Sequence, residues 1–341
     1  MKIIDAHSHL WWKQEAVVDG QAIKALPNGR AEFFGEERQM LPPFMIDGRN
    51  TAEVFLSNMD YAQVAAAVVV QEVIDGNQDA YLAEVQRRYP GRFFCCALCD
   101  LDRMSAVAET SPSGEGENGR LAVENGYGAR EAGRLAAENG CGEGENGRAE
   151  AGLSNAAGLP GVAIPGHRMK KPLNTAANIA FFKRLEKEGR ILSMCLADDA
   201  LQISQFKEVI QECPGLRVAI GHFGMVTGAH WREQVALAAA PNVFIEAGGI
   251  TWLYNSEFYP FPSAVRSIRE AADAVGIDKL MWGSDYPRTI TAITYRMSYD
   301  FVLKSQELTL EEKEKFLGGN AQKFYGFRDL PDLPYIKNMS E

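Results

Sequence analysis

The sequence predicts an α/β fold in which eight parallel strands alternate with helices and close into a (β/α)8 barrel, the TIM barrel architecture. Two observations predict it. Short apolar runs without polar alternation recur along the chain, and segments of helical spacing lie between most of them. Such runs are typical of strands buried on both faces, and a count of eight favours a closed barrel. Residues 1–341 are interpreted as one domain, since these barrels commonly exceed about 250 residues.

The predicted elements alternate along the whole chain. The strands are Lys2–Asp5, Ala65–Val70, Phe93–Cys99, Gly161–Pro165, Ile191–Leu196, Arg217–Ile220, Val243–Ala247 and Lys279–Trp282. The helices are Asn77–Tyr89, Ala176–Glu188, Leu201–Cys213, Trp231–Ala239 and Pro262–Ala274. Strands that alternate with helices in this way form parallel sheets rather than antiparallel ones.

Two long segments interrupt the alternation. Lys13–Phe55 is irregular and contains Pro and Gly, so it is interpreted as an extended loop after the first strand, where it would overhang the mouth of the barrel. A surface insertion without a role is the alternative. Residues 105–158 form a Gly-rich, repetitive insertion after the third strand. Gly119–Gly126 recurs as Gly133–Gly140, and Gly114–Arg120 recurs as Gly142–Arg148.

These repeat units are too polar and too rich in glycine to stack a core. We therefore expect a mobile insertion with a short helix at Ala129–Glu138, and a functional lid is the alternative.

Composition limits the class of protein. Hydrophobic residues make up 46% and charged residues 23% of the chain, as in an ordinary globular enzyme. The net charge of −10 counts against a nucleic-acid binder, although local Arg and Lys residues still permit an anionic substrate. An apolar leader and an apolar run of membrane-spanning length are both absent from the sequence, so neither secretion nor a membrane partner is expected.

The cysteines are scattered rather than arranged as a disulfide framework. They are Cys95, Cys96, Cys99, Cys141, Cys195 and Cys213. We expect them to be reduced and the protein to be cytoplasmic. Cys96 and Cys99 form a Cys-x-x-Cys within a strand-like run rather than at the start of a helix, which does not favour redox chemistry.

Two histidines follow the first predicted strand, in the sequence Asp5-Ala6-His7-Ser8-His9. Residues two apart in a strand point to the same face, so His7 and His9 are expected to aim together. Two neutral imidazoles that converge at a strand end make half of a divalent metal site. The pattern predicts a metal site, with a purely structural pair of histidines as the alternative.

Two more polar residues follow predicted strands. His222 ends the sixth strand, and Asp285 follows the eighth. An ionised aspartate near a dication would hold or deprotonate a water molecule. The alternatives are a capped core histidine and an aspartate that caps a helix N-terminus.

In this order, the three motifs resemble the amidohydrolase-related family, in its amidohydrolase 2 branch. The motifs are Asp5-Ala6-His7-Ser8-His9, Gly221-His222-Phe223-Gly224 and Met281-Trp282-Gly283-Ser284-Asp285-Tyr286-Pro287. The segment Phe316–Gly326 looks like the terminal helix of that family, so the resemblance spans nearly the whole chain. Members include carboxymuconate-semialdehyde decarboxylase-like enzymes, dicarboxylate lactonases and sugar-acid lactonases. The motifs therefore indicate the superfamily and leave the substrate open.

The resemblance implies roles for the residues that match it. His7 and His9 match the metal ligands of the first strand. Asp285 matches the eighth-strand carboxylate, which contacts the metal or acts as general base. His222 matches the sixth-strand histidine, which polarises or protonates the substrate. The implied cofactor is a divalent metal, zinc or manganese.

The chain departs from the family at the fifth strand, where many members carry a metal-binding histidine. The stretch Ser193–Asp199 contains no histidine. Cys195 or Asp198 could replace it, since thiolates and carboxylates both bind zinc. Alternatively, the site holds metal weakly or not at all, as in some lactonase-like members. The missing ligand counts against a decarboxylase.

Cationic and aromatic residues after the strand ends are candidates for binding an acidic substrate. Arg168 is the first candidate, because a guanidinium pairs well with a carboxylate. The other cationic candidates are His167, Lys170 and Arg288, and the aromatic ones are Trp11, Trp252, Tyr254 and Tyr286. Gln71 and Glu72, at the end of the second strand, are candidates for the lining of the pocket. Glu246, in the seventh strand, either points into the barrel or caps it.

The sequence thus predicts a hydrolase of a small organic acid derivative, which opens a lactone by metal- or histidine-assisted attack of water with Asp285 as general base. The alternatives are a metal-dependent nonoxidative decarboxylase of an unsaturated or aromatic acid, and a barrel that only binds ligands. The expected partner is a small acidic substrate and not a nucleic acid. Self-association into a homo-oligomer stays open, because barrels of this kind often self-associate.

Overall fold

The computed structural model describes residues 1–102, 158–337 and 339. Within them, eight strands form one parallel sheet in the order β1-β6-β7-β8-β9-β10-β11-β12. The strands are β1 (Ile3–Ser8), β6 (Val64–Val69), β7 (Phe93–Leu98), β8 (Gly161–Ile164), β9 (Ile191–Met194), β10 (Arg217–Ile220), β11 (Val243–Glu246) and β12 (Leu280–Met281). Each predicted strand is confirmed.

The first and last strands of this sheet lie side by side, so the sheet closes on itself. The Ala6 N–H donates to the Trp282 carbonyl at 2.9 Å, and the His9 N–H donates to the Tyr286 carbonyl at 2.7 Å. Ser8 and Tyr286 also pair as a parallel bridge. The fold is therefore the predicted (β/α)8 barrel.

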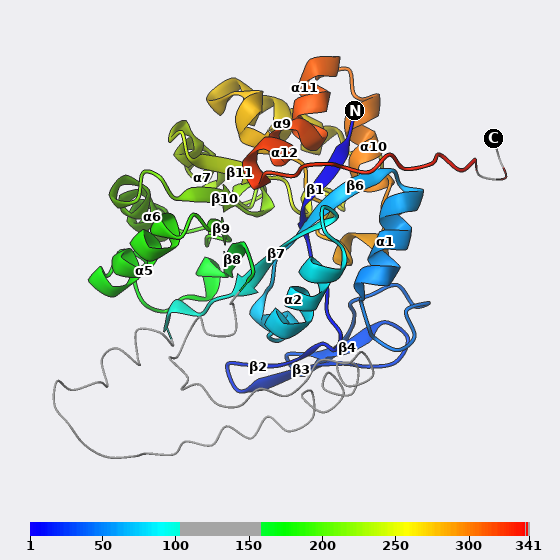
Figure 1. The fold of residues 1–341 in the computed structure, drawn as a ribbon, viewed down its shortest axis with the longest axis horizontal. Helices are drawn as coiled ribbons and strands as arrows, with labels where there is room; N and C mark the ends of the chain where they lie inside the picture. The colour runs from blue at the N-terminus through cyan, green and yellow to red at the C-terminus, as the bar shows by residue number, and fades with distance from the viewer. Residues whose placement is uncertain (103–157, 338, 340–341) are drawn as a thin grey trace.

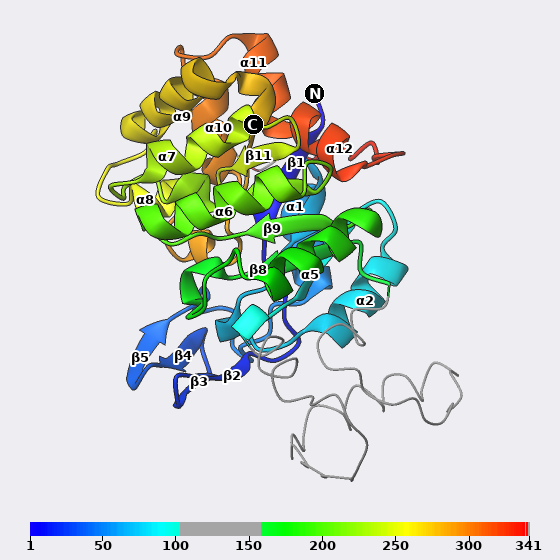
Figure 2. The ribbon, with the colours of Figure 1, turned by 90° about the vertical axis from the view of Figure 1, so that its left-hand side faces the viewer.

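Helices surround the sheet (Figures 1 and 2). They are α1 (Ala52–Tyr61), α2 (Asp79–Arg88), α5 (Ala176–Lys187), α6 (Ala200–Glu212), α7 (Trp231–Ala236), α8 (Ile250–Leu253), α9 (Pro262–Val275), α10 (Met297–Lys304), α11 (Leu310–Glu314) and α12 (Asn320–Tyr325). In α6, Ile203, Phe206 and Ile210 recur at helical spacing and are buried. The Asp199 side chain caps this helix by accepting the Leu201 N–H at 3.0 Å.

Apolar side chains fill the interior of the barrel at the amino-terminal end of its strands. Small and branched side chains from alternate strand positions, among them Ile4, Ala66 and Val68, form a cluster with Phe324 and Tyr325 of α12. The helix α12 lies beside the N-terminus at one end of the barrel, and β1 runs from there toward the opposite end (Figure 1). Polar residues at the carboxyl ends of the strands are thus left to form the open mouth.

The segment Lys13–Phe55 is not the irregular loop that the sequence predicts. It forms a four-stranded antiparallel sheet with β2 (Glu15–Val18), β3 (Gln21–Ala25), β4 (Arg30–Phe33) and β5 (Glu36–Gln39). The strands turn at Asp19-Gly20, Asn28-Gly29 and Phe34-Gly35, where all six residues have positive φ. Asp-Gly and Asn-Gly pairs are strong hairpin signals, because such turns need positive φ.

This small sheet lies at the same end of the barrel as the carboxyl terminus of β1 (Figures 1 and 2). The Lys170 ammonium, after β8, binds the Asp19 carboxylate of the β2–β3 turn at 2.9 Å. Arg168 lies 5.9 Å from the ring centroid of Phe34. The sheet is therefore joined to the mouth of the barrel, as expected for an insertion after the first strand.

Several predictions lie outside the described residues. These are the Gly-rich insertion at 105–158, apart from Gly158 itself, its helix at Ala129–Glu138, and Cys141. In the part of the chain that the structure describes, Cys95, Cys96, Cys195 and Cys213 have free thiols. No helix among those residues has the length and apolar character that crossing a membrane requires.

Candidate metal centre and active site

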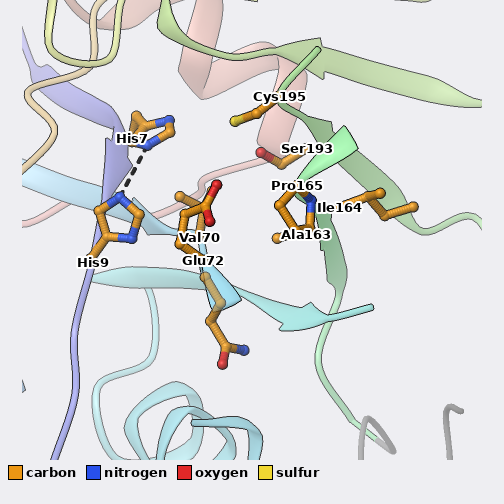
Figure 3. A pocket seen from close by; sticks show the side chains of 10 residues that line it. His7, His9, Val70, Glu72, Ala163, Ile164, Pro165, Ser193 and Cys195 are labelled. Carbon is orange, nitrogen blue, oxygen red and sulfur yellow. Dashed lines mark hydrogen bonds between the residues drawn. The ribbon is translucent and has the colours of Figure 1, made fainter. Parts of the chain in front are cut away.

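A small pocket opens at the carboxyl ends of β1, β6, β8 and β9 (Figure 3). Its lining residues are His7, His9, Val70, Gln71, Glu72, Ala163, Ile164, Pro165, Ser193 and Cys195. The two histidines lie on one side of this pocket, and Ser193 and Cys195 face them from the other (Figure 3). This is the end of a (β/α)8 barrel at which active sites form.

A bulge in β1 aims the histidines into the pocket. Asp5 pairs with Ala67 and Ser8 pairs with Val69, so three steps along β1 match two steps along β6. Ala6 packs in the barrel core, while His7 and His9 line the pocket. Bulges re-aim side chains and are common beside active sites. The histidines converge by alternation as predicted, and the extra residue before them turns both side chains toward the pocket.

Three donors meet where Asp285 joins the two histidines of this pocket. The Nε2 atoms of His7 and His9 lie 3.2 Å apart, and His9 Nε2 lies 3.0 Å from Asp285 Oδ1. His7 Nε2 lies 3.7 Å from the same oxygen. All three side chains are 1% exposed. Within the described residues, His7, His9 and Asp285 form the group whose donor atoms could hold a metal ion, all within 4.8 Å of one another.

The hydrogen bonds of His7 define its tautomer. Nδ1 lies 2.6 Å from Glu246 Oε1, and a carboxylate accepts, so Nδ1 carries the proton and Nε2 presents a lone pair. Burial, together with the neighbouring His9, lowers the pKa of His7 to about 3, which keeps the ring neutral. Burial also raises the pKa of Glu246, whereas the hydrogen bond from the Gly248 N–H favours its ionised form. A neutral imidazole with a free Nε2 is the form that ligates zinc.

His9 lies between two carboxylates. Its Nδ1 is 3.0 Å from Asp75 Oδ2, as an ion pair rather than a well-directed hydrogen bond, and its Nε2 contacts Asp285. Burial and Arg288 would lower the pKa of His9, but the two carboxylates outweigh them and raise it to about 9. Without a cation, this imidazole therefore holds a proton. A divalent cation would replace the proton on Nε2, so the donor set fits a metal ion.

Asp285 has several polar partners in the site. Besides His9, it accepts a hydrogen bond from Trp252 Nε1 at 2.7 Å and lies 3.5 Å from the Arg288 guanidinium. Although burial would raise it, these partners hold the pKa of Asp285 well below its usual range. The backbone of Asp285 has a φ of 58°, a sparsely populated conformation for residues other than glycine.

His222 stands beside the donor cluster. Its ring centroid lies 4.6 Å from that of His7, and its φ of 53° is also in the left-handed region. Nδ1 lies 3.0 Å from the Gly248 carbonyl, which can only accept, so Nδ1 carries the proton. Burial and His7 lower the pKa of His222. In its neutral form, Nε2 is therefore an acceptor and not a donor.

Asp75 also belongs to the site, although the sequence did not predict it. Asp75 is buried, and its Oδ1 accepts from Arg288 Nη2 at 2.8 Å while its Oδ2 faces His9. Asp75 ends the short turn after β6, in which the Glu72 and Asp75 side chains bind each other's backbone N–H groups. The two acidic residues, three positions apart in the sequence, are the signal of this reciprocal cap that could have pointed to Asp75.

Two predicted replacements for the missing histidine lie in different places. Cys195 lines the pocket, but burial raises the pKa of its thiol well above the usual value, and it is not part of the metal-ligand group. Asp198 is exposed and accepts the N–H groups of Ala229 and His230 at 2.8 and 2.7 Å. The structure thus uses Asp198 to fix a loop and not to bind a metal.

The predicted substrate-binding residues separate into two groups. Arg168 and His167 lie at the mouth, where Arg168 Nε is 3.4 Å and His167 Nε2 is 3.5 Å from the Glu72 carboxylate. Trp252 is 39% exposed and reaches Asp285 through its indole N–H. These three side chains are at least partly exposed, and contact with a substrate stays a prediction for them.

The other group is held by structural contacts. Gln71 lines the pocket, but its amide binds Asp79 and the Cys96 carbonyl, both at 2.8 Å. Tyr286 is fully buried, with its ring 4.0 Å from that of Phe55, so the structure places it in the core and not on the pocket wall. The position of Tyr286 after a strand end is explained by packing in the core rather than by substrate binding. Three further candidates are also held elsewhere: Trp11 bonds the Gly48 carbonyl, Tyr254 bonds Ser267, and Lys170 bonds Asp19.

Comparison with known proteins agrees with this site. A family model described as amidohydrolase matches residues 4–327. The chain belongs to the amidohydrolase family. No curated protein matches it.

Several solved structures share the fold of this chain. One is a zinc-bound amidohydrolase from Burkholderia multivorans, with 17% identity, a TM-score of 0.60, and coverage of 96% of this chain and 100% of that one. Another is a probable 2-pyrone-4,6-dicarboxylic acid hydrolase from Acinetobacter baumannii, with 17% identity, a TM-score of 0.59 and the same coverage. A third is 5-carboxyvanillate decarboxylase from Sphingomonas paucimobilis, with 14% identity, a TM-score of 0.51, and coverage of 84% and 86%.

Proposed function

We propose that this amidohydrolase opens a lactone of a small organic acid, with Asp285 as general base and a divalent metal held by His7, His9 and Asp285. The observation that carries the proposal is the composition of the site. Two imidazoles and one carboxylate converge, while the end of β9 offers Cys195 instead of a histidine, and Cys195 is not part of this ligand group. Such a sparse donor set suits hydrolysis better than a decarboxylation that depends on a full metal set.

The substrate class is supported by charge and by similarity of fold. Arg168, whose side chain is 27% exposed, has a long contact of 3.4 Å with Glu72, which a substrate carboxylate could replace. The Acinetobacter baumannii structure carries the name of a hydrolase of a pyrone dicarboxylic acid, which is a cyclic ester with two carboxylates, and it was solved with citric acid bound. A lactone that bears one or more carboxylates is therefore the proposed substrate.

The proposed lactone hydrolysis follows from the protonation states of the site residues. A divalent cation at the three donors would supply Lewis-acid polarisation of a carbonyl group. Asp285 stays ionised, so one of its oxygens accepts a proton from a water molecule that attacks the lactone carbonyl carbon. The ring C–O bond then breaks, and the proton held by Asp285 passes to the departing alkoxide, which leaves an open hydroxy acid.

The proposal gives His222 a different role from the one expected from the sequence. Because Nδ1–H is bound to the Gly248 carbonyl, the neutral ring presents a lone pair at Nε2. In this proposal, His222 accepts a hydrogen bond from water or from a substrate hydroxyl and orients it. It does not protonate the substrate.

Product analysis tests the proposal. The zinc-loaded protein is incubated with carboxylated lactones, including 2-pyrone-4,6-dicarboxylate, and separately with aromatic carboxylic acids. We expect one acid equivalent per lactone consumed and no carbon dioxide, with the activity lost in Asp285→Asn. Release of carbon dioxide from an aromatic acid, with no lactone opened, would support the decarboxylase instead.

A further inference from the structure

The carboxylate of Glu246 lies inside the barrel and contacts His7. Glu246 ends β11, and 1% of its surface is exposed. Its Oε1 accepts from His7 Nδ1 at 2.6 Å, and its Oε2 accepts the Gly248 N–H at 2.6 Å. Since each oxygen has its own donor, the carboxylate is held in one orientation.

Three glycines make room for this pair. A Cβ at Gly248 would lie 2.7 Å from His7 Cγ and 2.8 Å from Glu246 Oε2. A Cβ at Gly283 would lie 2.7 Å from His7 Cβ, and one at Gly221 would lie 2.8 Å from Glu246 Oε1. The glycines come from three different strand ends, at β10, β11 and β12. The backbone around the His7–Glu246 pair is thus closely fitted to both side chains.

A buried carboxylate is a costly way to fill this space. Removing a charged group from water destabilises the folded chain unless its partners compensate, and an apolar side chain would pack here without that cost. The side-chain partner of Glu246 is a predicted metal ligand. This arrangement is that of a carboxylate that orients a metal-binding histidine.

We propose that Glu246 is a positioning residue of the metal centre. By accepting from Nδ1, it fixes the tautomer and ring direction of His7, so that the Nε2 lone pair faces His9 and Asp285. The negative charge also makes the imidazole a stronger donor to a cation. This inference rests on the metal site of the proposed function, and it assigns to Glu246 a role in metal affinity.

Zinc affinity measured by competition with a chromogenic chelator tests the inference without any substrate. Glu246→Gln keeps the size of the side chain and one acceptor oxygen but removes the charge. We expect it to weaken zinc binding by about 10–100-fold, the usual loss for such partners. Glu246→Asp retains the charge but withdraws it by one methylene, and an intermediate loss is expected. The Co²⁺ absorption spectrum of both variants should also change.

The matched control is Asp79→Asn. Asp79 is another buried carboxylate, and its Oδ1 accepts from the Gln71 amide and from the Leu98 N–H. Its zinc affinity should stay within about twofold of wild type. Equal weakening in Asp79→Asn and Glu246→Gln, or unchanged affinity in both Glu246 variants, would overturn the inference alone. A wild-type protein that binds no zinc would overturn the metal site as well.

Discussion

The Nε2 atoms of His7 and His9 face each other at 3.2 Å in the mouth of the barrel. Two imidazole nitrogens that both present lone pairs at this distance repel each other unless a proton or a cation lies between them. The proton of His7 is on Nδ1, toward Glu246, so it cannot serve. The site is therefore built around one positive charge, held either as a proton on His9 or as a bound cation.

Metal content is the first prediction from this relationship. Freshly purified protein should contain about one zinc or manganese per chain, because a mononuclear site needs one ion. The double substitution His7→Ala/His9→Ala should reduce this to near zero in elemental analysis. The matched control is His230→Ala, a remote histidine that bonds Glu233. Full metal content in the double variant would place the ion elsewhere.

Asp285→Asn should abolish most turnover. The amide has nearly the same shape but cannot accept a proton from water, and general-base catalysis is typically worth about 10²–10⁴-fold in rate. We expect kcat for lactone opening to fall by this range while the circular dichroism spectrum is retained. Activity near that of the wild type would rule out Asp285 as the base.

Trp252→Phe tests the contact between the indole N–H and the Asp285 carboxylate, which measures 2.7 Å. A hydrogen bond to a charged group is worth about 1.5–3 kcal/mol, so its loss should lower kcat/KM by about 10–100-fold. Because Trp252 is 39% exposed, the melting temperature should change little. Kinetics identical to wild type would show that this bond does not hold the catalytic geometry.

The sequence predicted the barrel and the convergence of His7, His9 and Asp285, because buried parallel strands have a distinctive apolar pattern and their ends meet at one rim. It could not show the bulge before His7, since a bulge depends on the pairing of β1 with β6. It also left the direction of Glu246 open. A glutamate in a strand can point either way, and only the closed barrel brings it to His7.

Other differences arise from signals that were present in the sequence. The Asp19-Gly20 and Asn28-Gly29 pairs mark turns of the small antiparallel sheet, which was expected to be an irregular loop. Asp198 was a candidate ligand because of its place after β9, yet its carboxylate is taken by two backbone N–H groups. The loop conformation decides whether such a carboxylate binds nearby backbone N–H groups or a metal ion.

Tyr286 provides a prediction about the core. Its ring stacks on Phe55 with centroids 4.0 Å apart and is fully buried. Tyr286→Phe should leave KM within about twofold of wild type, whereas Tyr286→Ala should lower the free energy of unfolding by about 3–5 kcal/mol, as for other buried rings. A tenfold rise in KM in Tyr286→Phe, at unchanged melting temperature, would instead place the hydroxyl in the pocket.

The pH dependence of stability can be tested at α11. The Arg269 guanidinium bonds Glu312 at 2.6 Å, and the Thr309 N–H donates to Glu312 at 2.8 Å within a capping box. Together, these contacts lower the pKa of Glu312 from 4.5 to about 2. Because the folded-state pKa lies below the unfolded one, this carboxylate stabilises the fold fully above pH 4.5, and the contribution is lost as the pH falls toward 2.

Glu312→Gln should therefore lower the free energy of unfolding by about 1 kcal/mol at pH 7, and the difference from wild type should shrink steadily below pH 4.5. Urea denaturation at pH 7, 4.5 and 3 measures this difference. Glu311→Gln is the control, because Glu311 is exposed and pairs with Lys315 at the surface, where ion pairs contribute little. A difference that stayed constant from pH 7 to pH 3 would mean that the Glu312 side chain stabilises α11 through packing or neutral hydrogen bonds rather than through its charge.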